Sequence, residues 1–166
     1  MDAMFIYRMA IFFDRKYLRL LSKMFVYTNY FLHNSYIPAG CQIGKTSKFA
    51  YGGIGLVIHD NARIGEGCII GQGITIGGRN GIKEVPIIED NVFIGAGARI
   101  LGNVKIGHDS IVGVNAVVLI DIPPYSVVAG VPAKIISKIT KKSYEEKYQY
   151  YNGPKKYCDD SLDDKI

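Results

Sequence analysis

Residues 92–113 read VFIGAGARILGNVKIGHDSIVG, and every sixth residue of this stretch, counted from Ile94, is aliphatic. The same interval runs without a gap from Ile58 to Val118. The full series is Ile58, Ile64, Ile70, Ile76, Ile82, Ile88, Ile94, Ile100, Ile106, Val112 and Val118. A period of six matches neither the 3.6-residue period of an α-helix nor the two-residue alternation of a simple strand. It predicts a parallel β-helix, in which each hexad supplies one short strand and one turn.

Three hexads form one triangular coil of about 18 residues, so each aliphatic residue should stack on the residue about 18 positions later. The expected columns are Ile58, Ile76, Ile94 and Val112; Ile64, Ile82, Ile100 and Val118; and Ile70, Ile88 and Ile106. The position after the aliphatic residue is often glycine, which eases a sharp bend. A β-sandwich would show two-residue alternation and turns of variable length. The fold class is therefore mainly β, a left-handed parallel β-helix.

One stretch breaks the six-residue repeat, a second could leave the coil although it keeps the interval, and both ends of the chain lack the repeat. Residues 51–55 (YGGIG) either bulge out of the coil or reset its phase, and the turn-rich residues 77–81 (GGRNG) are candidates for a protruding loop. Residues 127–136 read as a closing strand. We expect an N-terminal helical segment over residues 1–35, the β-helix over 36–136, and a C-terminal helix and tail over 137–166.

Composition excludes several classes of protein. The chain has 166 residues, of which 19 are glycine and only 6 proline, so it is neither collagen-like nor of low complexity. The formal net charge of +5 is spread along the chain, and the central region is almost neutral, which argues against a nucleic-acid partner. Cys41, Cys68 and Cys158 form no CxxC motif. We expect neither a metal nor a disulfide framework, and a reduced, cytoplasmic setting.

The N-terminal segment is apolar and basic. Residues 3–33 contain no glycine or proline and should be helical, with Asp2 as N-cap. The favoured interpretation is a helix that caps the β-helix or packs on a sister subunit. The alternative is peripheral contact with the inner face of a membrane, where its arginines and lysines would meet lipid phosphates.

His59 is the strongest candidate for chemistry. It lies directly after the aliphatic Ile58, at a position that is glycine in the three later hexads of its expected column. A bulky imidazole at a bend breaks the local pattern, which is typical of functional sites. Histidine can act as a general base near neutral pH. Asp60 is a nearby carboxylate that could orient it, His108 is a weaker second candidate, and His33 reads as a surface residue.

Three stretches resemble the catalytic domain of serine acetyltransferase-like hexapeptide acyltransferases. They are residues 70–78 (IGQGITIGG), 92–103 (VFIGAGARILGN) and 128–135 (VAGVPAKI), and the resemblance covers residues 52–136. It implies a homotrimer with active sites between subunits, and acetyl-CoA as co-substrate. A histidine base would take the proton of an acceptor hydroxyl, which attacks the thioester directly. Matched position by position, the cofactor contacts fall on Gly78, Arg79, Ala96, Gly97, Val114 and Lys134.

The sequence also departs from that family. Aligned without gaps, the family's catalytic histidine falls near Gly52, and a second histidine of the family is replaced by Val85. The sequence 57–59 (VIH) is more similar to relatives that acetylate sugars in surface-polysaccharide pathways. The sequence-based hypothesis is therefore acetyl transfer to a hydroxyl of a sugar or surface-polysaccharide precursor, with His59 as base. Serine O-acetylation and a non-catalytic scaffold are the alternatives.

Overall fold

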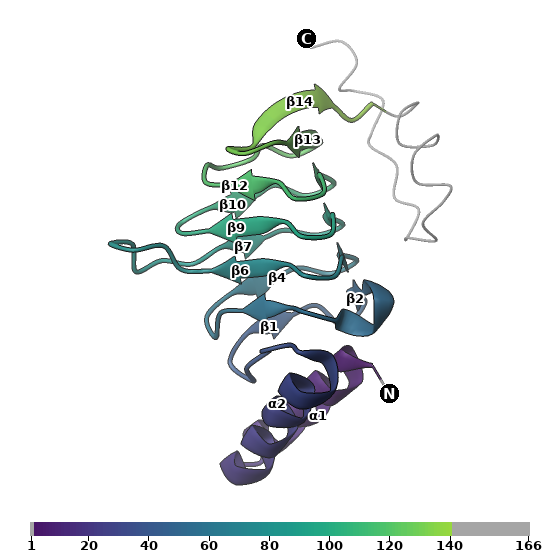
Figure 1. Cartoon of the computed structure of the whole chain (residues 1–166), viewed down its shortest axis with the longest axis vertical. Coiled ribbons are helices and arrows are strands. Elements are labelled where there is room, and N and C mark those ends of the chain that lie inside the picture. The colour runs from purple at the N-terminus through teal and green to yellow at the C-terminus, as the bar shows by residue number, and fades with distance from the viewer. Residues whose placement is uncertain (1, 141–166) are drawn as a thin grey trace.

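The structure is a computed structural model that describes residues 2–140. It confirms a parallel β-helix with three faces, which we name A, B and C (Figure 1). The chain runs from face A to B to C in each coil, and the AB, BC and CA corners join the faces. A helical hairpin lies at the N-terminal end of the prism, and an antiparallel strand lies at the other end (Figure 1).

The strands are short, and equivalent strands of successive coils pair in parallel. Face A contains β3 (Val57–Ile58), β6 (Thr75–Gly77), β9 (Arg99–Leu101) and β12 (Val117–Val118). Face B contains β1 (Gln42–Ile43), β4 (Arg63–Ile64), β7 (Ile87–Ile88) and β10 (Lys105–Ile106). Face C contains β2 (Lys48–Phe49), β5 (Ile69–Ile70), β8 (Phe93–Ile94), β11 (Ile111–Val112), β13 (Ser126–Ala129) and β14 (Lys134–Lys138).

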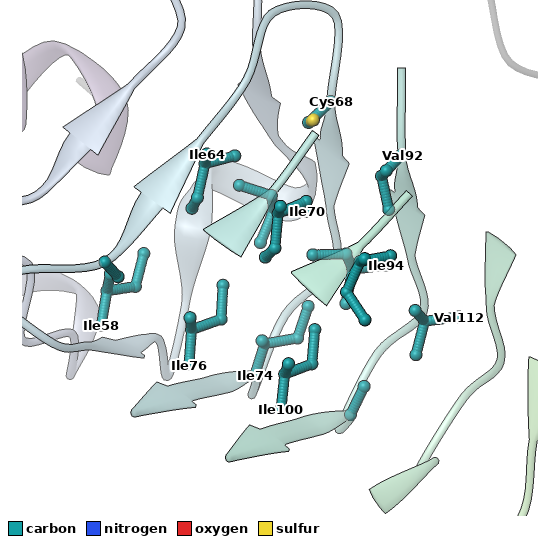
Figure 2. Packing of buried hydrophobic residues seen from close by; sticks show 14 of the residues in the cluster. Ile58, Ile64, Cys68, Ile70, Ile74, Ile76, Val92, Ile94, Ile100 and Val112 are labelled. Carbon is teal, nitrogen blue, oxygen red and sulfur yellow. The ribbon is translucent and has the colours of Figure 1, made fainter. Parts of the chain in front are cut away.

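Stacked aliphatic side chains fill the interior (Figure 2). One column joins Ile58, Ile76, Ile100 and Val118 on face A. Ile43, Ile64, Ile88 and Ile106 form the second column on face B, and Phe49, Ile70, Ile94, Val112 and Val128 the third on face C. Burial of these apolar side chains is the main force that holds the coils together.

The expected columns are wrong beyond Ile76. Ile76 pairs with Ile100 rather than stacking beneath Ile94, because one complete hexad leaves the coil in the loop of residues 78–86. Ile82 lies in that loop and is exposed, although it falls on the six-residue series. The loop is the long excursion between β6 and β7 in Figure 1. Protrusion of the turn-rich stretch is thus confirmed, and its effect on the register was missed.

The stretch at residues 51–55 both bulges and resets the phase. A short 3₁₀ turn, η1 (Ala50–Gly53), follows β2 and adds three residues before β3. Tyr51 and Gly52 both have positive φ there, at 49° and 72°. Upstream of η1 the six-residue period resumes, because Tyr36 bridges to Val57 and places Ile37 beneath Ile58.

The corners differ in how much space they leave. A Cβ atom at Gly71 would lie 2.7 Å from the amide nitrogen of Ala96, and one at Gly95 would lie 2.7 Å from that of Val114. The backbone of the next coil passes so close to these two CA-corner positions that only glycine fits there. A Cβ at Gly77, on the AB corner, would meet only a methyl group of Thr75 at 3.8 Å.

His59 stands on this roomier AB corner. Its true equivalents in later coils are Gly77, Leu101 and Leu119, as the pairing of Ile58, Ile76, Ile100 and Val118 shows. The argument that His59 occupies a glycine position is therefore wrong, since two of the three equivalents carry large side chains.

The N-terminal segment is a helical hairpin rather than one helix. The two helices are α1 (Ala3–Arg15) and α2 (Arg19–His33), and Tyr17 between them has φ of 60°. Asp2 caps α1 as predicted, because its Oδ1 accepts the Phe5 N–H at 2.8 Å. Phe13 and Phe25 stack between the two helices with ring centroids 5.4 Å apart.

The helix α1 closes the end of the β-helix. Its side chains Ala3, Met4 and Tyr7 belong to the central core, and the Tyr7 hydroxyl donates to the Cys41 carbonyl oxygen at 2.7 Å. The favoured capping interpretation is confirmed for α1.

The C-terminal end differs from the expected single closing strand. Two strands, β13 and β14, pair antiparallel, with a cis peptide bond at Val131–Pro132 between them. Residues 137 and 138, predicted to begin the C-terminal segment, belong to β14. The rest of that prediction, residues 141–166, lies outside the described residues.

Candidate functional site

The predicted site residues lie at the two corners that border face A. His59, Asp60, Gly78 and Arg79 belong to the AB corner, because they follow β3 and β6. Ala96, Gly97 and Val114 belong to the CA corner, because they follow β8 and β11. Lys134 follows Ala133, whose N–H donates to the Val117 carbonyl oxygen of face A at 2.8 Å. Within one chain, face A therefore separates the candidate base from most of the candidate cofactor contacts.

His59 is exposed and is held through one ring nitrogen. Its backbone N–H donates to the Ile76 carbonyl oxygen at 2.8 Å, which fixes the residue beside the protruding loop. Its Nδ1 atom accepts the Asn61 N–H at 3.1 Å. A neutral imidazole that accepts at Nδ1 carries its proton on Nε2. For Nε2 to accept a proton from a substrate, the ring must first release Asn61.

Asp60 contacts a different residue from the one it was predicted to orient. Its Oδ1 accepts the Gly40 N–H at 3.0 Å and so ties two coils together. In this conformation Asp60 holds the backbone near Gly40, and the Nδ1 atom of His59 is held by Asn61. A catalytic role for Asp60 stays a prediction.

The CA corner is a ledge of small residues with one exposed apolar side chain. The Gly97 N–H donates to the Gln72 carbonyl oxygen at 2.8 Å, so that amide is already engaged. The Ala96 carbonyl oxygen accepts the Asn115 N–H at 2.8 Å. Val114 stands out from the corner with 68% of its surface exposed.

Arg99 is a residue of this corner that the sequence reasoning missed. Its Nη1 donates to three carbonyl oxygens that border the ledge: Gly73 at 2.5 Å, Gly97 at 2.7 Å and Ala98 at 3.2 Å. The guanidinium carries a permanent positive charge and suits phosphate recognition. Its position on the outer side of β9, between two inward residues, is the signal that could have indicated it.

Gly78 and Arg79 begin the loop of residues 78–86. A Cβ atom at Gly78 would meet no atom within 4 Å, so the backbone there is open. The Arg79 carbonyl oxygen accepts the Ile82 N–H at 2.9 Å and closes a turn. A Cβ atom at Gly102 would lie 3.2 Å from the Cβ of Arg79, which shows how closely the loop passes over the next coil.

A second histidine has the geometry of a general base, but it lies on the BC corner. His108 Nδ1 lies 2.7 Å from Oδ2 of Asp109, so the aspartate can hold the ring proton on Nδ1 and leave Nε2 as acceptor. The other oxygen of Asp109 is buried with no hydrogen-bond partner within residues 2–140. The His108 ring meets Tyr125 edge to face at 4.9 Å.

Glu89 supports the backbone at this position. Its carboxylate accepts the His108 N–H at 2.9 Å and the Lys105 ammonium at 2.7 Å. The hydrogen bond from Lys105 is the main cause that lowers the pKa of Glu89. The carboxylate therefore stays ionised and keeps both bonds at neutral pH.

Two cysteines are structural rather than reactive. Burial raises the pKa of Cys41 to about 12 and that of Cys68 to about 11. Thiols with such pKa values hold very little of the nucleophilic thiolate at neutral pH. Among residues 2–140 there is also no group of three histidine, cysteine or acidic side chains that could hold a metal ion.

Gly52 lies near the position that the family resemblance assigns to a catalytic histidine. It lies in η1, ahead of face A, with φ of 72° and no atom within 4 Å of a built Cβ. The space would admit a side chain, although the left-handed backbone there favours glycine. Across the described part of the chain, neither helix has the length and hydrophobicity needed to cross a membrane.

Comparison with known proteins places this chain among acetyltransferase relatives. Residues 86–119 match the family described as "Bacterial transferase hexapeptide (six repeats)". A serine acetyltransferase of Synechococcus elongatus is 33% identical over 137 residues, which is 81% of this chain and 56% of that protein. A serine acetyltransferase of Staphylococcus aureus is 43% identical over 104 residues, which is 61% of this chain and 48% of that protein.

Solved structures give the same assignment. Serine acetyltransferase of Brucella abortus in complex with coenzyme A is 29% identical, with a TM-score of 0.78 over 82% of this chain and 55% of that one. Soybean serine acetyltransferase complexed with serine is 35% identical, with a TM-score of 0.74 over 81% of this chain and 56% of that one. The chain spans about half the length of the curated relatives it matches. The chain thus carries the hexapeptide repeat of bacterial transferases in residues 86–119, and the relatives and solved structures named here, to which it is similar, are serine acetyltransferases.

Proposed function

We propose that the protein is an acetyl-CoA-dependent O-acetyltransferase whose acceptor is the hydroxyl group of serine. The observation that carries the proposal is its similarity, over about four fifths of this chain, to serine acetyltransferases solved with coenzyme A and with serine. The serine alternative of the sequence analysis thus has better support than the sugar acceptor that was first favoured.

The two corners of face A suit two parts of the reaction. On the CA corner, the Ala96 and Gly97 ledge would carry the pantetheine arm, while Arg99 and Lys134 would attract the phosphates of CoA. On the AB corner, His59 would act on the acceptor. In a trimer, the AB corner of one subunit would face the CA corner of its neighbour, so that each active site lies between two chains.

The reaction needs only one base. His59 Nε2, once Asn61 is released, would take the proton of the acceptor hydroxyl, whose oxygen attacks the thioester carbonyl carbon. The tetrahedral intermediate collapses as the carbon–sulfur bond breaks. The imidazolium then returns the proton to the leaving thiolate, so that free CoA and the acetyl ester are formed. Backbone N–H groups at the open bend of Gly78 would stabilise the oxyanion.

A sugar hydroxyl is the second candidate acceptor, and a specific observation favours it. By the family resemblance, the catalytic histidine falls near Gly52, and a second histidine is replaced by Val85. Serine recognition in this chain must therefore use other side chains than those histidines. A Cβ atom built at Gly52 would meet no atom within 4 Å, and this open space would suit a larger acceptor.

The deciding experiment measures CoA thiol release from acetyl-CoA with the full chain, using serine and a panel of monosaccharides and nucleotide sugars. We expect release that depends on serine, with O-acetylserine identified by mass spectrometry. Release with a sugar alone would replace serine by that acceptor and keep the acetyltransferase activity. If calorimetry detects no CoA binding, the protein is a scaffold and the proposal fails.

A further inference from the structure

The outward side of α2 is an apolar stripe with no partner within residues 2–140. Leu20, Met24, Tyr27 and Phe31 follow one another at intervals of four, three and four residues, which places them on one side of the helix. Their exposed fractions are 83%, 53%, 58% and 80%. Single exposed apolar residues are common on protein surfaces, but four in one continuous stripe indicate an interaction surface.

The opposite side of α2 already serves the fold. Its buried residues are Ser22, Val26 and Asn29, and the Asn29 side-chain amide donates to the Ala3 carbonyl oxygen at 3.0 Å. Successive residues are 100° apart around a helix, so Leu20 and Ser22 lie on nearly opposite sides. The stripe therefore lies on the side of α2 opposite to its buried residues. The helix itself lies at the end of the molecule (Figure 1).

The charges beside the stripe are mostly positive. The helix α2 carries Arg19 and Lys23 and contains no acidic residue. The end of α1 and the link add Arg15 and Lys16 against one acid, Asp14, and Tyr17 in the link is 87% exposed. A second copy of α2 placed on the stripe would bring the same positive charges together. A membrane surface with anionic lipid has negative headgroups above an apolar interior. Such a surface matches both the positive charges and the apolar stripe of α2.

Aromatic residues support the same partner. Tyr27 and Tyr30 combine an apolar ring with a polar hydroxyl, and such side chains favour the boundary between water and hydrocarbon. Both helices are too short to span a membrane, so the hairpin would lie in the plane of the surface.

We propose that the stripe of Leu20, Met24, Tyr27 and Phe31 docks the protein on a membrane surface rich in anionic lipid. Arg15, Lys16, Arg19 and Lys23 meet the lipid phosphates, and the stripe enters the boundary between headgroups and acyl chains. In a trimer three such hairpins would act together, which raises avidity beyond that of one hairpin.

Vesicle flotation with the full chain tests this proposal. One set of vesicles contains phosphatidylcholine alone, and the other contains phosphatidylserine as well. We expect the protein to float with the anionic vesicles and to bind the neutral ones at least about tenfold more weakly. Added salt should weaken the binding, because it screens the lysines and arginines.

Two paired variants identify the surface. Leu20→Gln with Phe31→Gln should reduce binding to anionic vesicles at least about tenfold. Ile120→Gln with Ile136→Gln, which changes two exposed apolar residues elsewhere, should leave it unchanged. Both variants should keep the CoA release of the wild type, so failure of docking and failure of the proposed activity are separate results.

Three outcomes would overturn the proposal. They are absence of binding to either vesicle, equal binding by the Leu20→Gln/Phe31→Gln variant, and equal binding to neutral vesicles. If light scattering shows an assembly that this variant breaks apart while no vesicle binds, the stripe belongs to a second copy of the chain instead.

Discussion

At the scale of single residues, His59 and His108 differ in which ring nitrogen is free. The Asn61 N–H occupies Nδ1 of His59 and leaves the proton on Nε2. Asp109 instead accepts a hydrogen bond from Nδ1 of His108 and leaves Nε2 as an acceptor. His108 therefore has the better isolated geometry for a base, while His59 has the better location, beside face A and the protruding loop.

Substitution separates the two candidates. We expect His59→Ala to lower kcat at least about 100-fold, because a general base contributes about that much or more. His108→Ala should change kcat by less than about threefold and serves as the matched control. Steady-state CoA release and thermal unfolding are measured for both variants. Full activity in His59→Ala together with loss in His108→Ala would move the base to the BC corner.

The sequence predicts correctly that His59 lies at a bend, but it predicts the wrong equivalent residues in the later coils. Glycines are its equivalents only if every hexad remains in the coil. Ile82 follows the six-residue series although it lies in the loop, so periodicity alone does not distinguish a coil hexad from a looped one. The contacts of Arg99 depend on which carbonyl groups lie beside it across coils, which no local pattern records.

At the scale of elements, the loop of residues 78–86 is separable from the core. Removal of one six-residue hexad within this loop restores the 18-residue spacing between Ile76 and Ile100, which are neighbours in one column. Gly78 opens the loop with free space around its backbone, and Pro86 closes it as a buried residue. Changes in the loop should therefore affect catalysis while leaving the free energy of unfolding of the coils almost unchanged.

Deletion of residues 79–84 tests this separation. We expect the shortened protein to unfold within about 1 kcal/mol of the wild type, because loop length has a small effect on the free energy of unfolding. Its CoA release should fall at least about tenfold, because Arg79 and the rest of the loop beside His59 are lost. Loss of cooperative unfolding would show instead that the loop contributes to the core.

The sequence predicted elements well where repetition was strong and poorly where it ended. The hexads from Ile58 to Ile76 and from Ile88 to Val118 all supply strands. The break between α1 and α2 depends on the positive φ of Tyr17, and tyrosine has no preference that would indicate it. The strand reversal before β14 likewise follows from a turn whose conformation only the packed end of the coil defines.

At the scale of the whole molecule, the candidate site is divided between two corners of face A. A trimer would unite the AB corner of one chain with the CA corner of another. We expect light scattering to give a mass three times the 18.4 kDa of the chain.

Mixing experiments test the sharing directly. His59→Ala and Val114→Asp should each be inactive as pure assemblies, since one lacks the base and the other places a charge on the cofactor ledge. Unfolded together and refolded, they should recover part of the wild-type activity, because some sites receive an intact corner from each chain. Complete absence of recovery would place the site within a single chain.

The antiparallel strand β14 has a consequence for solubility at high concentration. A stack of parallel coils offers an open strand edge at each end, and two such edges could join head to tail into a filament. The hairpin covers the first coil, and β14 presents a reversed strand beyond β13 on face C. A strand of the opposite direction does not continue the parallel register, so growth by end-to-end addition of whole molecules is disfavoured.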